Sequence, residues 1–218
     1  MKRRLKVTEI FTSIQGESTH AGKPCAFVRL AGCNLNCTYC DTAYSKSLSH
    51  GKWMSLPTIL AKIRKAGIKL VEITGGEPLL QAGTPALCKA LIRAGFEVLV
   101  ETNGSLDVSV LPNGAIRILD CKCPDSGEAA STDTSNFGRL ARTDEIKFVV
   151  SGRKDYLYTR RMIAEWRLDR ITPNILISPV RPKLDPARLA KWMLADRIPA
   201  RMQLQIHKII WHPEKRKV

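Results

Sequence analysis

Three cysteines within a span of eight residues are the strongest chemical signal in this sequence. Cys33, Cys37 and Cys40 form a C-x-x-x-C-x-x-C pattern, and Tyr39 precedes the last of them. Thiolates this close together converge readily on one metal centre, and sulfur ligands favour iron–sulfur clusters or zinc. Polar residues such as Asn34 lie between the cysteines, which makes simple burial a poor explanation. The pattern therefore predicts a metal centre.

The number of available ligands separates the two kinds of centre. A structural zinc ion takes four protein ligands, so this alternative would need to recruit His50. A cubane cluster held by three cysteines leaves one iron open to a small molecule. The spacing favours the cluster, and a basic zinc-binding nucleic-acid module stays open as the alternative.

Three further segments stand where a predicted strand ends. Thr74-Gly75-Gly76-Glu77-Pro78 has two glycines that let the backbone approach a ligand, and Glu77 could contact an ammonium group. The other two segments are residues 101–105 and residues 120–124. Each of them taken alone is equally consistent with an ordinary loop. The cysteines outside the motif are too few and too scattered for a second cluster.

These segments need a scaffold that brings strand ends together. Apolar runs predict strands, and apolar residues at helical spacing, with Ser55 and Asp185 as caps, predict helices. Strands that alternate with helices pair in parallel through right-handed crossovers. About six such units fit, fewer than a closed eight-unit barrel requires. The predicted strands are 25–30, 69–74, 96–101, 115–120, 145–150, 174–178 and a late strand 202–210, and the predicted helices are 55–66, 85–94, 153–167 and 185–196.

We therefore expect an α/β fold, an open and partial (β/α)6-type barrel, formed by residues 1–218 as a single domain. In such folds the carboxyl ends of the strands form the working face. The cysteine motif and the three strand-end segments all fall there. This placement predicts one site that contains all of them.

Composition narrows the class of protein. The chain has 218 residues, 44% of them hydrophobic, with seven cysteines and a net charge of +15. An odd number of cysteines excludes a fully paired disulfide framework in a monomer. No run reaches the roughly 18 apolar residues of a membrane span, and Met1–Lys6 leads into no signal-peptide core. We expect a cytoplasmic protein without membrane contact, whose charge is a solvated face, a nucleic-acid surface or a dock for an acidic electron carrier.

The cysteine motif with Tyr39 resembles that of radical S-adenosylmethionine (SAM) enzymes, and the Gly-Gly-Glu-Pro turn is similar to their SAM-amine segment. Residues 9–18, the Cys-Asp-Thr ending at Thr42, and residues 203–211 resemble the 7-carboxy-7-deazaguanine synthase family. The resemblance implies conversion of 6-carboxy-5,6,7,8-tetrahydropterin to 7-carboxy-7-deazaguanine with loss of ammonia, in deazapurine pathways such as queuosine synthesis. It implies one 4Fe–4S cluster, SAM and Mg²⁺ as cofactors, a flavodoxin or ferredoxin as electron donor, a homodimer, and no bound nucleic acid.

The resemblance also assigns residues to roles, with the radical chemistry left to the cofactors. Cys33, Cys37 and Cys40 would hold the cluster, and Thr42 would bind Mg²⁺. Lys122 would neutralise the SAM carboxylate, and Arg29 would hold the substrate carboxylate. The implied SAM contacts are Tyr39, Cys40, Asp41, Gly75, Gly76, Glu77, Asn103, Asp120, Cys121 and Lys122. The implied substrate contacts are Ile14, Gln15, Gly16, Glu17, Arg29, Thr74, His207 and Pro213.

Two features depart from the family pattern. Ser18 follows the Gln-Gly-Glu motif where glycine is frequent, and five residues follow Pro213, where some members end. A glycyl-radical activating enzyme of the same superfamily is the nearest rival. It would share the cysteines and the Gly-Gly-Glu-Pro turn, but the Gln15-Gly16-Glu17 block argues against it.

Overall fold

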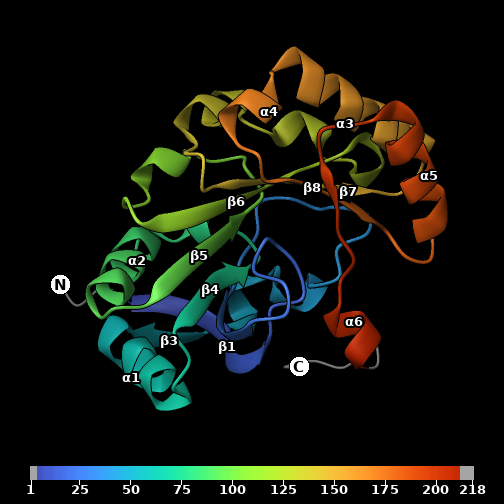
Figure 1. Cartoon of the computed structure of the whole chain (residues 1–218). Coiled ribbons are helices and arrows are strands. Elements are labelled where there is room, and N and C mark those ends of the chain that lie inside the picture. Colours follow the sequence, from blue (N-terminus) through green and yellow to red (C-terminus); the bar gives the residue numbers. More distant parts are fainter. Residues whose placement is uncertain (1–3, 212–218) are drawn as a thin grey trace.

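The computed structural model describes residues 4–211, and one sheet of nine strands organises them (Figure 1). The strands are β1 Arg4–Ile14, β2 Pro24–Leu30, β3 Lys52–Ser55, β4 Leu70–Gly75, β5 Glu97–Thr102, β6 Ala115–Cys121, β7 Glu145–Val150, β8 Ile175–Pro179 and β9 Arg201–Met202. The α-helices are α1 Leu56–Ala66, α2 Thr84–Arg93, α3 Arg153–Glu165, α4 Leu168–Ile171, α5 Pro186–Asp196 and α6 His207–Ile210.

The sheet is open, as the sequence predicts. Its strand order is β3-β1-β2-β4-β5-β6-β7-β8-β9, and no ladder joins β3 to β9. All pairs from β2 through β9 are parallel. The carboxyl ends of these strands therefore lie along one edge, which is where the predicted site residues fall.

Two antiparallel strands were not expected from the sequence. β1 pairs antiparallel with both β2 and β3, so the sheet begins with a hairpin instead of a parallel unit. The turn of this hairpin carries the Gln15-Gly16-Glu17 block. The hairpin thus extends the sheet at one edge and delivers a candidate substrate-reading segment to the strand ends.

The helix predictions are confirmed, and their caps explain where the helices begin and end. The Ser55 hydroxyl accepts a hydrogen bond from Thr58 N (3.2 Å), and Gly67 ends α1 with a φ of 70°. Asp185 caps α5 in the same way through Ala187 N (3.1 Å). The bounds agree to within one residue except at the end of the 153–167 helix, where α3 stops at Glu165 and a short α4 follows.

Apolar side chains form three clusters around the sheet. One cluster packs α1 and α2 against β2, β4 and β5, and a second packs α3, α4 and α5 against β6, β7 and β8. The third lies inside the curved sheet and includes Phe27, Leu70, Leu99 and Ile118. This inner cluster fills the lower part of the barrel, so polar side chains above it can surround a cavity at the carboxyl ends.

The prediction of a late strand at 202–210 is wrong over most of its length. Only Arg201–Met202 pairs with β8, and the chain then forms α6. Polar contacts draw this segment away from the sheet, since Ile206 N donates to Gly16 O (3.0 Å) and Lys208 Nζ lies 2.8 Å from Asp41 Oδ2. The segment therefore crosses toward the β1–β2 hairpin and the cysteine loop (Figure 1).

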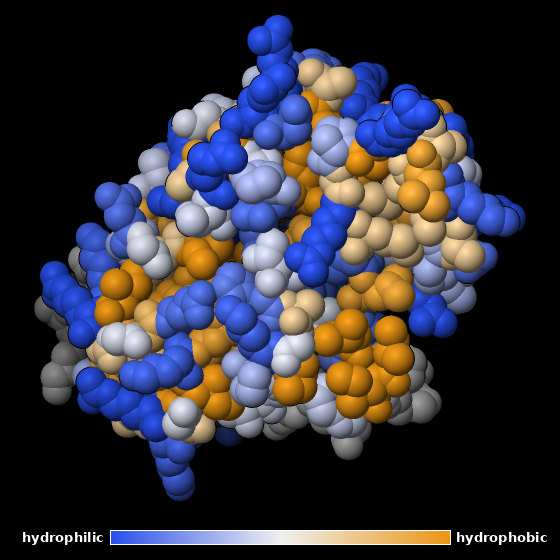
Figure 2. Space-filling model, in the orientation of Figure 1, coloured by the Kyte–Doolittle hydropathy of each residue, from blue (hydrophilic) through white to orange (hydrophobic). Residues whose placement is uncertain are grey.

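Hydrophilic and apolar side chains are mixed on the face of the molecule seen in Figure 2, and one group of apolar side chains lies over α6. Ile209 and Ile210 contribute to this patch and are 58% and 54% exposed. Within residues 4–211, no helix has the length and apolar character that crossing a membrane requires.

Candidate active site

A cavity of about 910 Å³ opens at the carboxyl ends of the strands. This volume lies toward the upper end of the range for small-molecule sites. Its walls come from β2, β4–β8, the cysteine loop, the β1–β2 hairpin and the segment around α6. Residues that are distant in the sequence therefore face one space.

The cysteine loop forms one wall of this cavity. Cys33, Cys37 and Cys40 are half-buried free thiols that all line it. Backbone hydrogen bonds hold the loop at two points, from Cys33 N to Lys46 O (3.0 Å) and from Thr38 N to Ser126 O (3.0 Å). Three thiols on an anchored loop beside open space are the donor set that an iron–sulfur cluster uses. The residues fit the cluster that the sequence predicts.

The structure gives less support to the alternative of a single zinc ion. Among residues 4–211, no three His, Cys, Asp or Glu side chains are arranged around one metal ion. His50, the fourth ligand of the zinc alternative, places its Nδ1 2.6 Å from the Tyr44 carbonyl oxygen. Thr42 lies beside the motif, with its Oγ1 3.7 Å from Cys40 Sγ, and also lines the cavity.

The Gly-Gly-Glu-Pro turn packs against the cysteine loop and β2. A Cβ on Gly76 would lie 2.1 Å from Gly32 O, and one on Gly75 would lie 2.1 Å from Leu30 O. Gly75 also has a φ of 140°, which side-chain-bearing residues rarely adopt. The glycines are therefore required by packing within the protein, in addition to any contact with a ligand.

Glu77 has a different role from the one expected. It is fully buried, does not line the cavity, and accepts hydrogen bonds from Leu79 N (2.8 Å), Thr102 Oγ1 (2.8 Å) and Asn103 N (2.7 Å). Burial raises the pKa of this carboxyl, although its hydrogen bonds oppose the effect. Glu77 joins the ends of β4 and β5, and the predicted contact with the SAM ammonium group does not fit this geometry.

The ends of β5 and β6 carry the other predicted SAM contacts. Asn103 Nδ2 donates to Asn34 Oδ1 (3.0 Å), which ties the end of β5 to the cysteine loop. Asp120 Oδ2 lies 2.7 Å from Lys122 Nζ, and both residues line the cavity. The thiol of Cys121, another predicted SAM contact, is buried in the core between the sheet and α3–α5 and does not line the cavity.

One carboxyl oxygen of Asp120 is available to accept a hydrogen bond from a ligand. Its Oδ1 is buried and has no hydrogen-bond partner in the part of the chain that the structure describes. Burial works against ionisation of Asp120, but the ammonium groups of Lys122 and Lys147 outweigh it and hold the pKa of this carboxyl below its usual value. A ligand hydroxyl or amine could satisfy this oxygen, which fits a cofactor bound beside the thiols.

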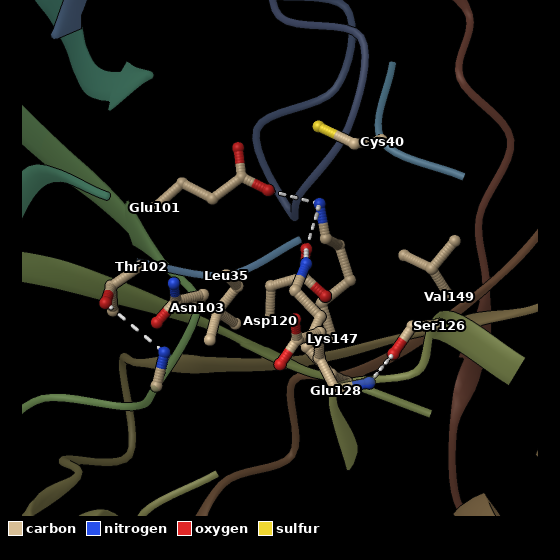
Figure 3. A network of polar contacts seen from close by, with 12 residues as sticks. Leu35, Cys40, Glu101, Thr102, Asn103, Asp120, Ser126, Glu128, Lys147 and Val149 are labelled. Carbon is tan, nitrogen blue, oxygen red and sulfur yellow. Dashed lines mark hydrogen bonds and ion pairs between the residues drawn. The ribbon is translucent and has the colours of Figure 1, made fainter. Parts of the chain in front are cut away.

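A cluster of charged side chains lines the cavity. Lys147 Nζ contacts Glu101 Oε1, lies 2.7 Å from Glu17 Oε2 and lies 3.8 Å from Asp120 Oδ2. Figure 3 shows Lys147 pointing to Glu101, with the thiol of Cys40 nearby. Burial works against the charge, but the three carboxylates outweigh it and raise the pKa of Lys147. Lys147 therefore links the hairpin to the ends of β5 and β6.

Arg29 and Thr74 line the side of the cavity next to the hairpin. Arg29 Nε lies 2.9 Å from Glu9 Oε1, which also accepts a hydrogen bond from Tyr44 OH (2.9 Å). This ion pair gives the Nε–H of the buried guanidinium a partner. It also fixes the orientation of the two terminal nitrogens. Thr74 Oγ1 donates to Glu101 Oε2 (3.3 Å).

The segment around α6 lines the cavity next to the β1–β2 hairpin. Gln205 Nε2 donates to a Glu17 oxygen, and the imidazole of His207 packs against Gly16 so closely that a Cβ there would lie 1.9 Å from Nδ1. Burial lowers the pKa of His207, which favours a neutral ring at physiological pH. Pro213, the remaining predicted contact, lies outside the described residues.

Most of the predicted site residues therefore face one cavity. Those that line it are Ile14, Gln15, Gly16, Glu17, Arg29, Cys33, Cys37, Tyr39, Cys40, Asp41, Thr42, Thr74, Gly75, Gly76, Asn103, Asp120, Lys122 and His207. Sequence reasoning missed further lining residues, chief among them Glu72, Lys147, Ser178, Pro179, Val180, Arg181, Lys183, Gln205 and Lys208. A signal was available, because charged residues such as Glu72 and Lys147 interrupt otherwise apolar strands.

Comparisons with known proteins agree with this site. The radical SAM superfamily pattern matches residues 28–120. A 7-carboxy-7-deazaguanine synthase from Chlorobaculum tepidum is 45% identical over 98% of this chain and 97% of its own length. Another from Koribacter versatilis is 40% identical over 98% of this chain and 100% of its own length.

Solved structures point the same way. The crystal structure of QueE from Escherichia coli has a TM-score of 0.76 at 25% identity and covers 93% of this chain and 94% of that one. The peptide-bound SuiB of Streptococcus suis, at 14% identity and a TM-score of 0.56, shares the fold alone. These findings decide against the glycyl-radical activating enzyme and the zinc-binding nucleic-acid module. With its thiol-lined cavity and near full-length similarity, the chain belongs to the 7-carboxy-7-deazaguanine synthase family of radical SAM enzymes.

Proposed function

We propose that this enzyme, a lyase, converts 6-carboxy-5,6,7,8-tetrahydropterin to 7-carboxy-7-deazaguanine with loss of ammonia, a step in queuosine and other deazapurine biosynthesis. One observation carries the proposal: the three thiols of the cysteine motif and the Gln15-Gly16-Glu17 block border the same cavity. A cofactor on the thiols would therefore act on a substrate held by the hairpin.

Cys33, Cys37 and Cys40 would hold a 4Fe–4S cluster, with SAM beside it against Asp120 and Lys122. When bound, these groups supply one-electron cleavage of the SAM sulfonium, the source of a hydrogen-abstracting radical. Lys122 would face the SAM carboxylate, and the unpaired Asp120 Oδ1 would accept a hydrogen bond from the cofactor. The half-buried loop and the α6 segment would limit the access of water.

The remaining walls suit the substrate. The terminal nitrogens of Arg29 would hold the carboxylate, since a guanidinium can pair with it in a bidentate manner. Thr42 would share Mg²⁺ with that carboxylate, because this hard cation takes much of its shell from substrate oxygens and water. Gln15, Gly16 and Glu17 would read the polar edge of the pterin, while Thr74 and His207 would contact the ring.

The proposal also covers the electron donor, the domain organisation, the oligomeric state and the location of the enzyme. The family acts on a small molecule and depends on an external reductant. We propose a flavodoxin or ferredoxin in that role, and the net charge of +15 supports an acidic partner. We further propose one domain, a homodimer and a cytoplasmic location.

Anaerobic turnover of 6-carboxy-5,6,7,8-tetrahydropterin tests this function directly. Reconstituted enzyme should form the deazapurine chromophore and release ammonia. Arg29→Ala should raise the apparent substrate constant about 10- to 150-fold, the effect of losing a charge-assisted hydrogen bond of about 1.5–3 kcal/mol. Thr42→Ala should remove most of the magnesium stimulation.

Matched controls keep the two roles separate. Both variants should retain the iron and sulfide content of the parent enzyme, because neither residue is a thiol ligand. A full magnesium response in Thr42→Ala would place the metal elsewhere. Absence of product from fully loaded parent enzyme would overturn the proposed reaction.

A further inference from the structure

Glu72 is an acidic residue in the middle of a buried strand. It lies in β4 two residues before Thr74, on the interior face, whereas Val71 and Ile73 pack in the cluster beneath α1 and α2. Its side chain is buried, with 4% of the residue exposed, and it borders the cavity. Burial of an ionised group costs free energy, so a carboxyl at this depth indicates a specific role.

Gln15 fixes the orientation of this carboxyl. The Gln15 Oε1 accepts a hydrogen bond from Glu17 N (3.1 Å), so the other end of the amide must be the donor. That donor, Nε2, contacts Glu72 Oε2. Oε2 therefore acts as an acceptor, and Oε1 is the remaining oxygen of the carboxyl.

Burial and the surrounding charges together favour the protonated form of Glu72. Burial first, and then the carboxylates of Glu101 and Glu17, raise the pKa of Glu72 well above its usual value, while Gln15 and Lys147 oppose the effect. The opposing ammonium group of Lys147 is already shared between Glu17 and Glu101. These influences favour the protonated form of Glu72, in which Oε1 carries the proton because Oε2 accepts from Gln15 Nε2.

We propose that Glu72 is a specificity-determining residue that donates a hydrogen bond from Oε1 to an acceptor atom of a heterocyclic substrate. The acceptor would be a ring carbonyl or an unprotonated ring nitrogen. The hairpin block that holds Oε2 is the same block that reads the substrate edge, so one contact positions Gln15 and Glu72 together. This inference rests on the proposed function and adds a binding group from β4.

The test compares a substitution that keeps both hydrogen bonds of Glu72 with one that removes both. In Glu72→Gln the new amide can accept from Gln15 through its oxygen and donate to the ligand through its nitrogen. Glu72→Leu keeps the size and removes both contacts. The probe is 6-carboxypterin, whose fluorescence reports binding to anaerobically reconstituted, SAM-loaded enzyme.

Glu72→Gln should bind the probe with nearly the parent affinity. Glu72→Leu should bind it about 5- to 150-fold more weakly, the range for leaving one buried polar partner unpaired. Asp144→Asn is the matched control, because Asp144 is a buried carboxyl paired with Arg117 (3.2 Å) and does not line the cavity. It should lower the midpoint of thermal unfolding without changing probe affinity.

The pH profile separates a hydrogen-bond donor from a merely structural residue. Parent affinity should fall as pH rises through the raised pKa of Glu72, while Glu72→Gln should lack that limb. Any pH dependence that both proteins share belongs to the probe or to other groups. Equal affinity in the parent and a folded Glu72→Leu variant would overturn the inference. A parent enzyme that neither binds the probe nor turns over the tetrahydropterin would instead overturn the proposed function.

Discussion

Replacing Glu77 by alanine should destabilise the protein even when no cofactor is bound. The buried carboxylate accepts three hydrogen bonds at 2.7–2.8 Å, from Leu79 N, Thr102 Oγ1 and Asn103 N. Each stranded donor costs about 1–3 kcal/mol when water cannot replace the acceptor. Partial hydration of the space left by the side chain reduces the sum. We expect a loss of about 3–5 kcal/mol, a large share of a typical folding free energy of about 5–15 kcal/mol.

Thermal unfolding of the cluster-free protein measures this effect. For a domain of this size, 1 kcal/mol corresponds to about 2–4 °C, so the midpoint should fall by roughly 6–20 °C. Glu128→Ala is the matched control, because Glu128 also accepts from a backbone amide, Asn36 N (2.6 Å), but at an exposed position. Its midpoint should hardly change.

The opposite pattern would refute this interpretation of Glu77. If the carboxylate instead contacted the SAM ammonium group, Glu77→Ala would weaken SAM affinity and leave the unfolding midpoint of the cofactor-free protein unchanged. Measuring SAM affinity by equilibrium dialysis on the same preparations separates the two. A midpoint within about 2 °C of the parent, together with a tenfold weaker SAM affinity, would favour the direct contact.

Three other perturbations test the site and its supports. Cys40→Ala should abolish SAM cleavage and lower the iron content, whereas Cys121→Ala should keep about four irons per chain; equal iron in both would contradict the ligand assignment. Gly76→Val should fail to assemble the cysteine loop, because its Cβ would meet Gly32 O, and parent-like unfolding and SAM affinity would contradict this. His20 hydrogen bonds to Glu97 (2.9 Å), and Glu145 is the main cause of the raised pKa of His20. The stabilisation that protonated His20 provides should therefore be complete below about pH 6.5 and should be lost as pH rises through the raised pKa. His20→Gln should flatten that part of the stability–pH curve, and an unchanged curve would exclude the role.

The parallel part of the fold was predictable because its signals are local. Apolar runs mark β4 through β8, and caps such as Ser55 and Asp185 mark where helices begin. β1 was missed because polar residues such as Lys6, Thr8 and Glu9 interrupt it, so that it contains no continuous apolar run. Its pairing with β2 depends on contacts across the hairpin, which no short window of sequence contains.

The prediction of a late strand at 202–210 failed for a related reason. The residues of 202–210 alternate in polarity as a strand would, yet Gln205 and Lys208 find partners in Glu17 and Asp41, far away in the sequence. These long-range contacts outweigh local propensity. The same limit applies to the site, where a motif can show that Glu77 matters but cannot show which donors its oxygens accept.

The two sides of the cavity are built by different means, and this difference has a consequence for specificity. Backbone amides, closely packed glycines and Glu77 fix the side formed by the cysteine loop and the ends of β4 and β5. Side-chain pairs such as Lys147 with Glu17, and Glu72 with Gln15, fix the side formed by the hairpin. Substitution on the first side disturbs folding and cofactor together. Substitution on the second side changes hydrogen-bond donors and acceptors while the strands stay in place, so changes in substrate preference should arise there.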